Sequence, residues 1–417
     1  MDKKNKLTVL LFEDSSADNL FPLSVLRPVF EIKTGAFSLL EKIREFIPPK
    51  TTLSLHCRAL LENYLRAENP GCGVNILPDS DCLLINGRVV ISKKDFKYIM
   101  GNLPANTFIS KDDSVIFAKL DKNILSLLSE IPAGEPLNIE RFRGLGLNEL
   151  ANPDLQEIKI VSYPWDILKD FETFLNDDLK QVFKPSKKKS PGKNVRVISQ
   201  EDISISVKAK IMPHVVLDAS NGKIFISDNA VIEPYSYIKG PVYIGKDTLI
   251  KAGTKIYGPA VIGFGSKVAG EISGSLFHAC VNKQHDGFIG NTYACPFVNF
   301  GADTVTSNLK NNYSKVRVNF KGKSIETNMQ FLGTIAGDHS KFGINTMLNT
   351  GTIVGIFANV AGGGFPDKFI DSFSWLILGS DPVKYKINEA LETAKTVMAR
   401  RHIELKPEYE ELIRKVY

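Results

Sequence analysis

The feature of this 417-residue sequence that most restricts its fold is a row of aliphatic residues spaced six positions apart. A six-residue period cannot come from an α-helix, whose apolar residues recur at every third and fourth position. It is typical of short strands separated by tight corners, in which one aliphatic side chain per face points inward. The alternative is a β-sandwich with accidental spacing, but the run is unbroken through eight residues: Ile226, Ile232, Ile238, Ile244, Ile250, Ile256, Ile262 and Val268. We therefore predict a left-handed parallel β-helix built from hexapeptide repeats.

The repeat region is expected to extend over residues 195–375. The period lapses between about residues 269 and 284 and then resumes, and we expect a loop to leave the solenoid at that lapse. Residues 376–417 are amphipathic and rich in Ala, Leu, Glu and Lys, which predicts C-terminal helices. We expect these helices to cover the open end of the solenoid, which otherwise exposes apolar surface.

The first part of the chain has a different pattern. Residues 1–183 alternate strand-like and helix-like segments, which predicts a Rossmann-like α/β domain with a mostly parallel sheet. Residues 184–194 combine Pro, Gly, Ser and a run of lysines, which is the composition of a linker. The predicted order is therefore an α/β domain, a linker, a β-helix and a helical C-terminal segment.

Charge and cysteine content restrict the environment and the partners. The net charge of +6 is mild for this length and does not indicate a nucleic-acid surface. The five cysteines are odd in number and lack metal-binding spacing, which indicates reduced thiols in a cytosolic protein. The apolar run near the N-terminus is too short for a signal peptide, and no segment is long enough to span a bilayer. We expect a cytoplasmic protein without membrane or nucleic-acid partners.

One stretch after the lapse carries candidate chemistry. His285 precedes Phe288-Ile289-Gly290, and the run NFGADTVTSN follows at 299–308. These residues and their spacing resemble the acetyltransferase half of bifunctional enzymes that join glucosamine-1-phosphate N-acetyltransferase to N-acetylglucosamine-1-phosphate uridyltransferase activity. The family has Tyr where this chain has Phe288. Basic residues expected before the motif have only two candidates, Lys255 and Lys283.

The resemblance implies a role for each matched residue. His285 would be the general base that takes the proton from the attacking amine, a task suited to an imidazole near its own pKa. Asn299 and Asn308 would position the substrate. Ala302 would lie beside acetyl-CoA, and Ile344 along its pantetheine arm. The resemblance also implies a homotrimer, with acetyl-CoA bound between neighbouring subunits. The alternative for His285 is an ordinary loop residue bonded to a backbone carbonyl.

The N-terminal domain also carries a resemblance. The stretch FPLSVLRPVFEIKTG at 21–35 resembles the start of sugar-nucleotidyltransferase domains, and Arg27 and Lys33 are its candidate substrate-binding cations. Such domains use Mg²⁺, but Asn86 stands where the family carries a metal-binding acid. Asp14 or Asp81 would have to substitute, and the sequence does not decide between them. The segment LLFEDSSADN also lacks the glycines of a phosphate-binding loop.

Three hypotheses follow. The first is a bifunctional transferase that uses acetyl-CoA, UTP and an amino-sugar 1-phosphate, such as glucosamine 1-phosphate, to make UDP-N-acetylglucosamine. The second is an acyltransferase whose N-terminal domain is inert. The third is a non-catalytic hexapeptide scaffold, since the repeat alone does not define a function.

Overall fold

The computed structural model describes residues 7–128, 132–151, 155, 157–182 and 191–417. The chain divides into two compact units. The first comprises Met1–Lys33, Phe37–Tyr163 and Lys406–Val416, and the second comprises Thr34–Ala36, Pro164–Leu405 and Tyr417. Most of the predicted linker, residues 183–190, lies outside the described residues.

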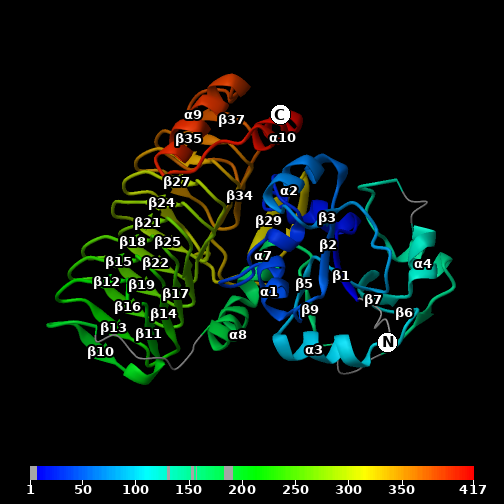
Figure 1. Cartoon of the computed structure of the whole chain (residues 1–417). Coiled ribbons are helices and arrows are strands. Elements are labelled where there is room, and N and C mark those ends of the chain that lie inside the picture. Colours follow the sequence, from blue (N-terminus) through cyan, green and yellow to red (C-terminus); the bar gives the residue numbers. More distant parts are fainter. Residues whose placement is uncertain (1–6, 129–131, 152–154, 156, 183–190) are drawn as a thin grey trace. The chain divides into compact units, whose positions relative to one another are not determined.

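The first unit is built on a sheet that has seven strands within the described residues, in the order β3-β2-β1-β4-β7-β6-β8. All neighbours pair in parallel except those of β7, which is antiparallel to β4 and β6 (Figure 1). The mostly parallel α/β sheet is therefore confirmed. The strands are β1 (Thr8–Phe12), β2 (Thr52–His56), β3 (Gly73–Val74), β4 (Cys82–Asn86), β6 (Thr107–Lys111), β7 (Ser114–Leu120) and β8 (Asn148–Glu149).

Two helices of this unit, α1 and α3, begin at capping boxes that the sequence encodes. Ser38 and Glu41 form a capping box at the start of α1, and Ser92 and Asp95 form another at α3. The apolar face of α1 is buried, as its amphipathic sequence predicts. The α-helices are α1 (Leu39–Phe46), α2 (Glu62–Glu68), α3 (Lys93–Asn102), α4 (Lys122–Leu127), α5 (Ile139–Gly144) and α10 (Pro407–Val416); a small pair of strands adds β5 (Val89–Val90) and β9 (Lys159–Ile160).

The second unit is a three-sided parallel β-helix (Figure 1). In the inner coils, each coil contributes one strand to each of three sheets, and equivalent strands of successive coils pair in parallel. The first sheet contains β10 (Arg196–Ile198), β13 (Val216–Asp218), β16 (Tyr237–Lys239), β19 (Lys255–Tyr257), β22 (Glu271–Ser273) and β25 (Phe288–Gly290). The second contains β11 (Ile203–Ile205), β14 (Ile224–Ile226), β17 (Val242–Ile244), β20 (Ala260–Ile262), β23 (Leu276–Phe277), β26 (Tyr293–Ala294), β31 (Thr334–Ala336), β34 (Thr352–Val354) and β36 (Phe369–Ile370).

The third sheet contains β12 (Lys210–Ile211), β15 (Val231–Ile232), β18 (Leu249–Ile250), β21 (Lys267–Val268), β24 (Asn282–Lys283), β27 (Asn299–Phe300), β32 (Lys341–Phe342), β35 (Asn359–Ala361), β37 (Ser374–Ile377) and β38 (Val383–Lys384). A further parallel pair joins β28 (Val305–Thr306) to β33 (Met347–Leu348). The unit is completed by α7 (Pro164–Lys169), α8 (Phe171–Val182) and α9 (Ile387–Ala399).

The predicted aliphatic row forms the core of the β-helix. All eight residues from Ile226 to Val268 are fully buried. Ile226, Ile244 and Ile262 are partners in successive coils, and the other members stack in the same way on the remaining sheets. The six-residue spacing is therefore one strand plus one corner, and three such steps complete a coil.

One substitution tests this stacking. Ile250 pairs with Ile232 below and Val268 above, so Ile250→Ala should leave a cavity in the solenoid. We expect the free energy of unfolding of this unit to fall by about 2–5 kcal/mol. Urea unfolding followed by circular dichroism measures the loss. Leu249→Ala, the half-buried neighbour on the same strand, is the control and should cost much less; equal losses would contradict the stacking model.

The expected loop at residues 269–284 is absent from the structure, and this prediction was wrong. The segment forms β22, β23 and β24, which continue the three sheets. The period lapses because the corners are shorter: Val261 pairs with Leu276, fifteen residues on rather than eighteen.

The segment that leaves the solenoid is 309–331. It carries the antiparallel hairpin β29 (Arg317–Phe320) and β30 (Lys323–Glu326), and the Leu309–Phe331 bridge closes its base.

The C-terminal helices are present, but they do not both cap the solenoid as expected. Helix α9 belongs to the second unit, and beyond its end the Arg401 Nε donates to the Gly265 carbonyl of an inner coil at 3.1 Å. Helix α10 belongs to the first unit, where Tyr409 packs on Tyr64 with ring centroids 5.4 Å apart. The limits of the two compact units thus differ from those of the predicted segments in two places. Helix α10 belongs to the first unit, and helices α7 and α8 belong to the second.

Candidate functional sites

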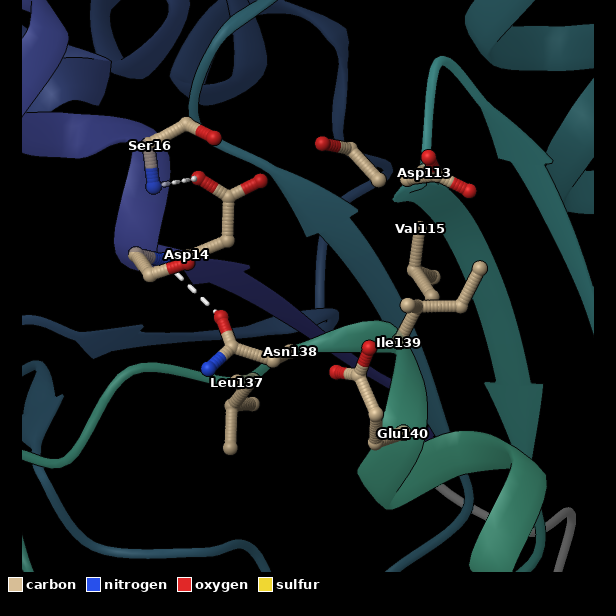
Figure 2. A pocket seen from close by; sticks show the side chains of 10 residues that line it. Asp14, Ser16, Asp113, Val115, Leu137, Asn138, Ile139 and Glu140 are labelled. Atoms are coloured by element: carbon tan, nitrogen blue, oxygen red, sulfur yellow. Dashed lines mark hydrogen bonds between the residues drawn. The ribbon is translucent and has the colours of Figure 1, made fainter.

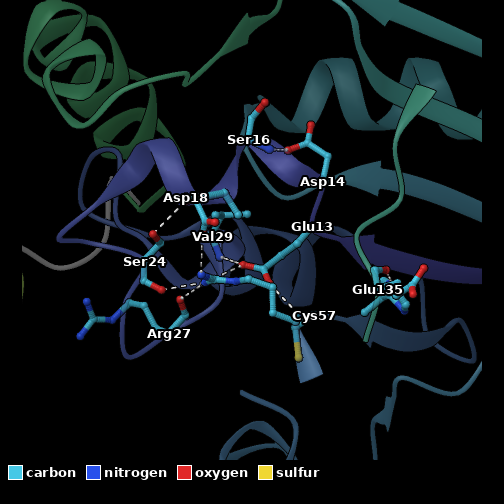
Figure 3. A network of polar contacts seen from close by, with 12 residues as sticks. Glu13, Asp14, Ser16, Asp18, Ser24, Arg27, Val29, Cys57 and Glu135 are labelled. Atoms are coloured by element: carbon cyan, nitrogen blue, oxygen red, sulfur yellow. Dashed lines mark hydrogen bonds and ion pairs between the residues drawn. The ribbon is translucent and has the colours of Figure 1, made fainter. Parts of the chain in front are cut away.

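The carboxyl end of β1 carries two acids that the structure uses differently. The first, Glu13, is fully buried, and its Oε1 accepts a hydrogen bond from the Val29 N–H at 2.9 Å (Figure 3). Its Oε2 accepts from the N–H and the Nε of Arg58, at 2.9 and 3.1 Å. The Arg58 guanidinium also donates to the Ser24 carbonyl at 2.7 Å. Glu13 and Arg58 therefore fix the segment around residues 24–29 against the ends of β1 and β2.

The second acid, Asp14, is already fully bonded. Its Oδ1 accepts from the Ser16 N–H at 3.1 Å and the Arg88 Nε at 2.9 Å. Its Oδ2 accepts from Asn86 at 2.8 Å and from a second Arg88 nitrogen at 2.6 Å. Asn86 is itself fully buried and also donates to the Val115 carbonyl at 2.9 Å. The amide at position 86 thus serves this network.

The alternative acid, Asp81, lies at the other edge of the sheet. It precedes β4, and its carbonyl accepts from the Thr8 N–H at the start of β1. Ligands of parallel sheets bind beyond the carboxyl ends of the strands, where Asp14 lies. No group of three His, Cys, Asp or Glu side chains suited to a metal occurs among the described residues. Asp14, the candidate acid at this edge, already accepts hydrogen bonds from protein donors on both of its carboxylate oxygens.

A small polar pocket opens at this carboxyl edge (Figure 2). Its volume is about 130 Å³. The N–H groups that begin η1 (Ser15–Leu20) are used internally: Ser15 donates to the Asn138 Oδ1 at 3.0 Å and Ser16 donates to Asp14. Side chains of the chain itself therefore occupy the amides that a glycine-rich loop would offer to phosphates. The lining residues are Asp14, Ser15, Ser16, Asp113, Ser114, Val115, Leu137, Asn138, Ile139 and Glu140.

The two predicted cations do not line this pocket. Arg27 is buried and donates to the Leu23 carbonyl at 2.9 Å, and Figure 3 shows its side chain directed away from Asp14. It lies near Glu31, where burial raises the pKa of the carboxyl to about 7 although the Arg27 charge opposes the rise. Lys33 pairs with Glu41 at 3.6 Å.

In the β-helix, three predicted residues lie along one edge. The Asp303 N–H donates to the Asp286 carbonyl at 2.9 Å, and the Asn345 N–H donates to the Ala302 carbonyl at 2.8 Å. This pattern stacks the corners of three successive coils, so that His285, Ala302 and Ile344 follow one another along the edge. His285 is exposed, and Ile344 is 68% exposed. We call this row of three residues the corner edge.

Two backbone amides on the corner edge are open. Within the described residues, the N–H groups of Ala302 and Ile344 have no acceptor from the protein. A lower coil shows the contrast, because the N–H of Ala252 at the equivalent corner donates to the Glu233 carboxylate at 2.9 Å. The coils stack tightly here, since a Cβ on Gly301 would lie 2.8 Å from the Ile344 nitrogen.

The two predicted asparagines flank the corner edge. Asn299 is half-buried on β27, before the Ala302 corner, and Asn308 follows β28, after it. The Asn308 Nδ2 donates to the Asn291 Oδ1 at 2.7 Å. The Phe288 ring lies close by, because a Cβ on Gly290 would meet both the Phe288 ring and the Asn308 amide.

Sequence reasoning missed the network of Glu13, Asp14, Arg58 and Arg88. Paired acids directly after a buried strand were the available signal, but their partners lie 45 and 74 positions away. It also misread Lys283: this side chain is fully buried and cannot meet a sugar phosphate, whereas Lys255 is exposed.

Comparison with known proteins agrees with the division of the chain into an α/β domain and a hexapeptide β-helix. Residues 9–186 match the family model described as sugar nucleotidyl transferase, and residues 223–258 match the model of bacterial transferase hexapeptide repeats. The chain therefore joins a sugar nucleotidyltransferase domain to hexapeptide repeats, which confirms the predicted combination. No helix within the described ranges is long and apolar enough to cross a membrane.

One curated relative has a nucleotidylyltransferase and an acetyltransferase in its name, and others are named as bifunctional proteins. A bifunctional sugar-1-phosphate nucleotidylyltransferase/acetyltransferase from Sulfurisphaera tokodaii is 27% identical over 63% of this chain and 59% of its own length. The bifunctional protein GlmU of Methanococcus vannielii is 24% identical over 81% of each chain. That of Methanocaldococcus jannaschii is 26% identical over 64% of this chain and 58% of its own. This chain thus spans less than two thirds of the Sulfurisphaera and Methanocaldococcus relatives.

Proposed function

We propose that the chain is a bifunctional transferase that acetylates an amino-sugar 1-phosphate and transfers a uridylyl group to the product. The acceptor we propose is glucosamine 1-phosphate, which would give UDP-N-acetylglucosamine from acetyl-CoA and UTP. Relatives named for both activities support the combination. The observation that carries the acetyl-transfer half is the corner edge, where the turn of the exposed His285 stacks on corners that carry two open backbone amides.

The corner edge suits attack of an amine on a thioester. The amine must lose its proton, and the His285 imidazole is a suitable general base, worth about 10²–10⁴-fold. The thioester oxygen gains negative charge in the transition state, and the open Ala302 N–H is a fixed donor for it. Asn299 and Asn308, on either side of the edge, would hold the acceptor. Ile344 would pack against the pantetheine arm.

The uridylyl half is assigned to the pocket at the carboxyl end of β1. The location agrees with the rule for ligand binding in open parallel sheets. We assign nucleotide contacts to Ser15, Ser16 and Ser114 of the pocket lining, rather than to Arg27 and Lys33. Mg²⁺ would be held at this edge mainly by the phosphate oxygens of UTP, because both Asp14 oxygens already accept hydrogen bonds from the protein, and it would neutralise charge on the triphosphate.

Assembly and location are part of the proposal. An edge with an exposed aliphatic residue suits a cosubstrate shared between neighbouring subunits, so we propose a homotrimer. Sedimentation should give three times the chain mass of 46.2 kDa, and a stable monomer would argue against a shared site. All five cysteines are free, which suits a reducing cytoplasm.

A product screen tests the whole proposal. The protein is incubated with acetyl-CoA, UTP, Mg²⁺ and a panel of amino-sugar phosphates, and products are identified by mass spectrometry. An acetylated nucleotide sugar supports both halves. An acetylated sugar phosphate without nucleotide product would favour the acyltransferase with an inert N-terminal domain. Absence of both would favour the scaffold.

Ile344 gives a test of the cosubstrate position. Ile344→Asp places a charge where we expect the pantetheine arm, so the KM for acetyl-CoA should rise about tenfold with kcat nearly unchanged. Val207→Asp is the control, because Val207 is equally exposed at 71% but lies elsewhere on the solenoid. An unchanged KM in the Ile344 variant would remove this residue from the site.

A further inference from the structure

The coil that carries His285 contains a lysine where its neighbours have apolar residues. On the third sheet of the β-helix, Ile250 pairs with Val268, and Val268 pairs with Lys283. In the next coils the row continues with Phe300 and Phe342. Lys283 is as fully buried as these neighbours. A buried ammonium is costly unless specific partners compensate it, so this exception in the row needs an explanation.

The Lys283 side chain ends at the backbone of the His285 turn. Its Nζ donates to the carbonyls of His285 and Asp286. The preceding carbonyl, of Gln284, accepts from the Lys251 Nζ at 3.2 Å. Three consecutive carbonyls of this turn are therefore held by ammonium groups that come from inside or below the coil.

The rest of the turn is equally constrained. Gly287 has a φ of +121°, and a Cβ there would lie 2.3 Å from the Thr304 carbonyl oxygen and 3.2 Å from the Lys283 Nζ. Burial lowers the pKa of Lys283 to about 8, whereas the charges of Asp286 and Asp303 favour the ammonium form. The ammonium thus binds two consecutive carbonyls of the turn that carries the exposed His285.

We propose that Lys283 is a positioning residue for acetyl transfer: it fixes the backbone of His285 so that the imidazole stays beside the Ala302 corner. This inference rests on the proposed function of His285. A purely structural role would lower stability without a separate loss of kcat, whereas a positioning role lowers kcat even where the protein stays folded. Replacing the lysine by an apolar residue leaves the His285 and Asp286 carbonyls without this donor, which destabilises the turn.

The test is Lys283→Met, which restores the apolar row without the ammonium. We expect the melting temperature to fall by a few degrees, because two carbonyls lose their donor, with the β-helix still folded at the assay temperature. We expect kcat for acetyl transfer to fall about 10–100-fold, with the KM for acetyl-CoA within twofold, because a displacement of about 1 Å in a catalytic group can cost 10²-fold. Hydrogen–deuterium exchange in the 284–288 segment should become faster. Lys283→Arg should recover part of kcat, since it keeps a donor inside the coil.

Lys267→Met is the matched control, one coil below at the position that pairs with Asn282. It should change neither kcat nor exchange at 284–288. An unchanged kcat in Lys283→Met would overturn the inference. A lower kcat that is explained entirely by a smaller folded fraction at the assay temperature would overturn it as well. If the wild-type protein shows no acetyl transfer, the proposed function fails, and hydrogen–deuterium exchange alone tests whether Lys283 fixes the backbone of the His285 turn. Faster exchange at 284–288 in Lys283→Met supports that role, and unchanged exchange overturns it.

Discussion

His285→Asn should remove acetyl transfer almost completely while the β-helix stays folded. The amide of Asn cannot take a proton from an amine at neutral pH, so kcat should fall by about 10²–10⁴-fold. His285 is exposed, and its imidazole makes no hydrogen bond or ion pair with the residues that the structure describes, so the melting temperature should stay within a degree or two of the wild type. Acetyl-CoA consumption, measured by release of the free thiol, gives the rate.

His402→Asn is the matched control for this change. His402 is also exposed in the second unit, and its φ of +56° is a conformation that Asn adopts readily. It should retain full acetyl transfer. Retained turnover in His285→Asn would remove the general-base role from this residue, and loss in both variants would point to a general effect on the protein.

Arg88→Met should destabilise the first unit strongly. The Arg88 and Asp14 side chains are only 2% and 5% exposed, and their closest nitrogen–oxygen distance is 2.6 Å. Removing the guanidinium leaves a buried carboxylate without its charge partner, which typically costs about 3–5 kcal/mol. Calorimetry of the full chain should show a lower transition temperature for the unit that contains β1 and β4, with the β-helix transition unchanged.

Arg414→Met in the same unit is the control, because Arg414 pairs with Glu410 at 2.8 Å on the exposed face of α10. Such surface pairs contribute less than about 1 kcal/mol. The double variant Asp14→Asn with Arg88→Met removes the unpaired charge and should recover more than half of the loss. A cost for Arg88→Met no larger than that of Arg414→Met would show that Asp14 is stabilised by other groups.

The β-helix was predictable because its signal is local and repeated. Each residue of the aliphatic row from Ile226 to Val268 marks one strand and the corner that follows it. The six-residue period therefore predicts the fold before any contact is known. The interruption was not predictable in the same way. A shortened corner, as between Val261 and Leu276, and an inserted loop break the period alike, so the loop was expected before His285 rather than after Asn308.

The family resemblance named His285, Ala302 and Ile344, and the structure brings their corners together along one edge, while their roles in acetyl transfer stay predictions. The features that need coordinates are those made by distant partners. The Asp14–Arg88 pair joins positions far apart in sequence, and the lysine beneath His285 is distinguished only by its burial. In both cases the sequence gives the residue type, but it does not show where the side chain points or which residue it contacts.

The hairpin at residues 309–331 shows what stacked coils allow. It separates Ala302 from Ile344 in the chain, yet these residues remain in adjacent coils, and the Leu309–Phe331 bridge closes the inserted segment at its base. Position along the corner edge therefore depends on coil stacking and not on chain length. The insert can thus vary in length without moving the corner that carries Ala302 relative to the corner that carries Ile344.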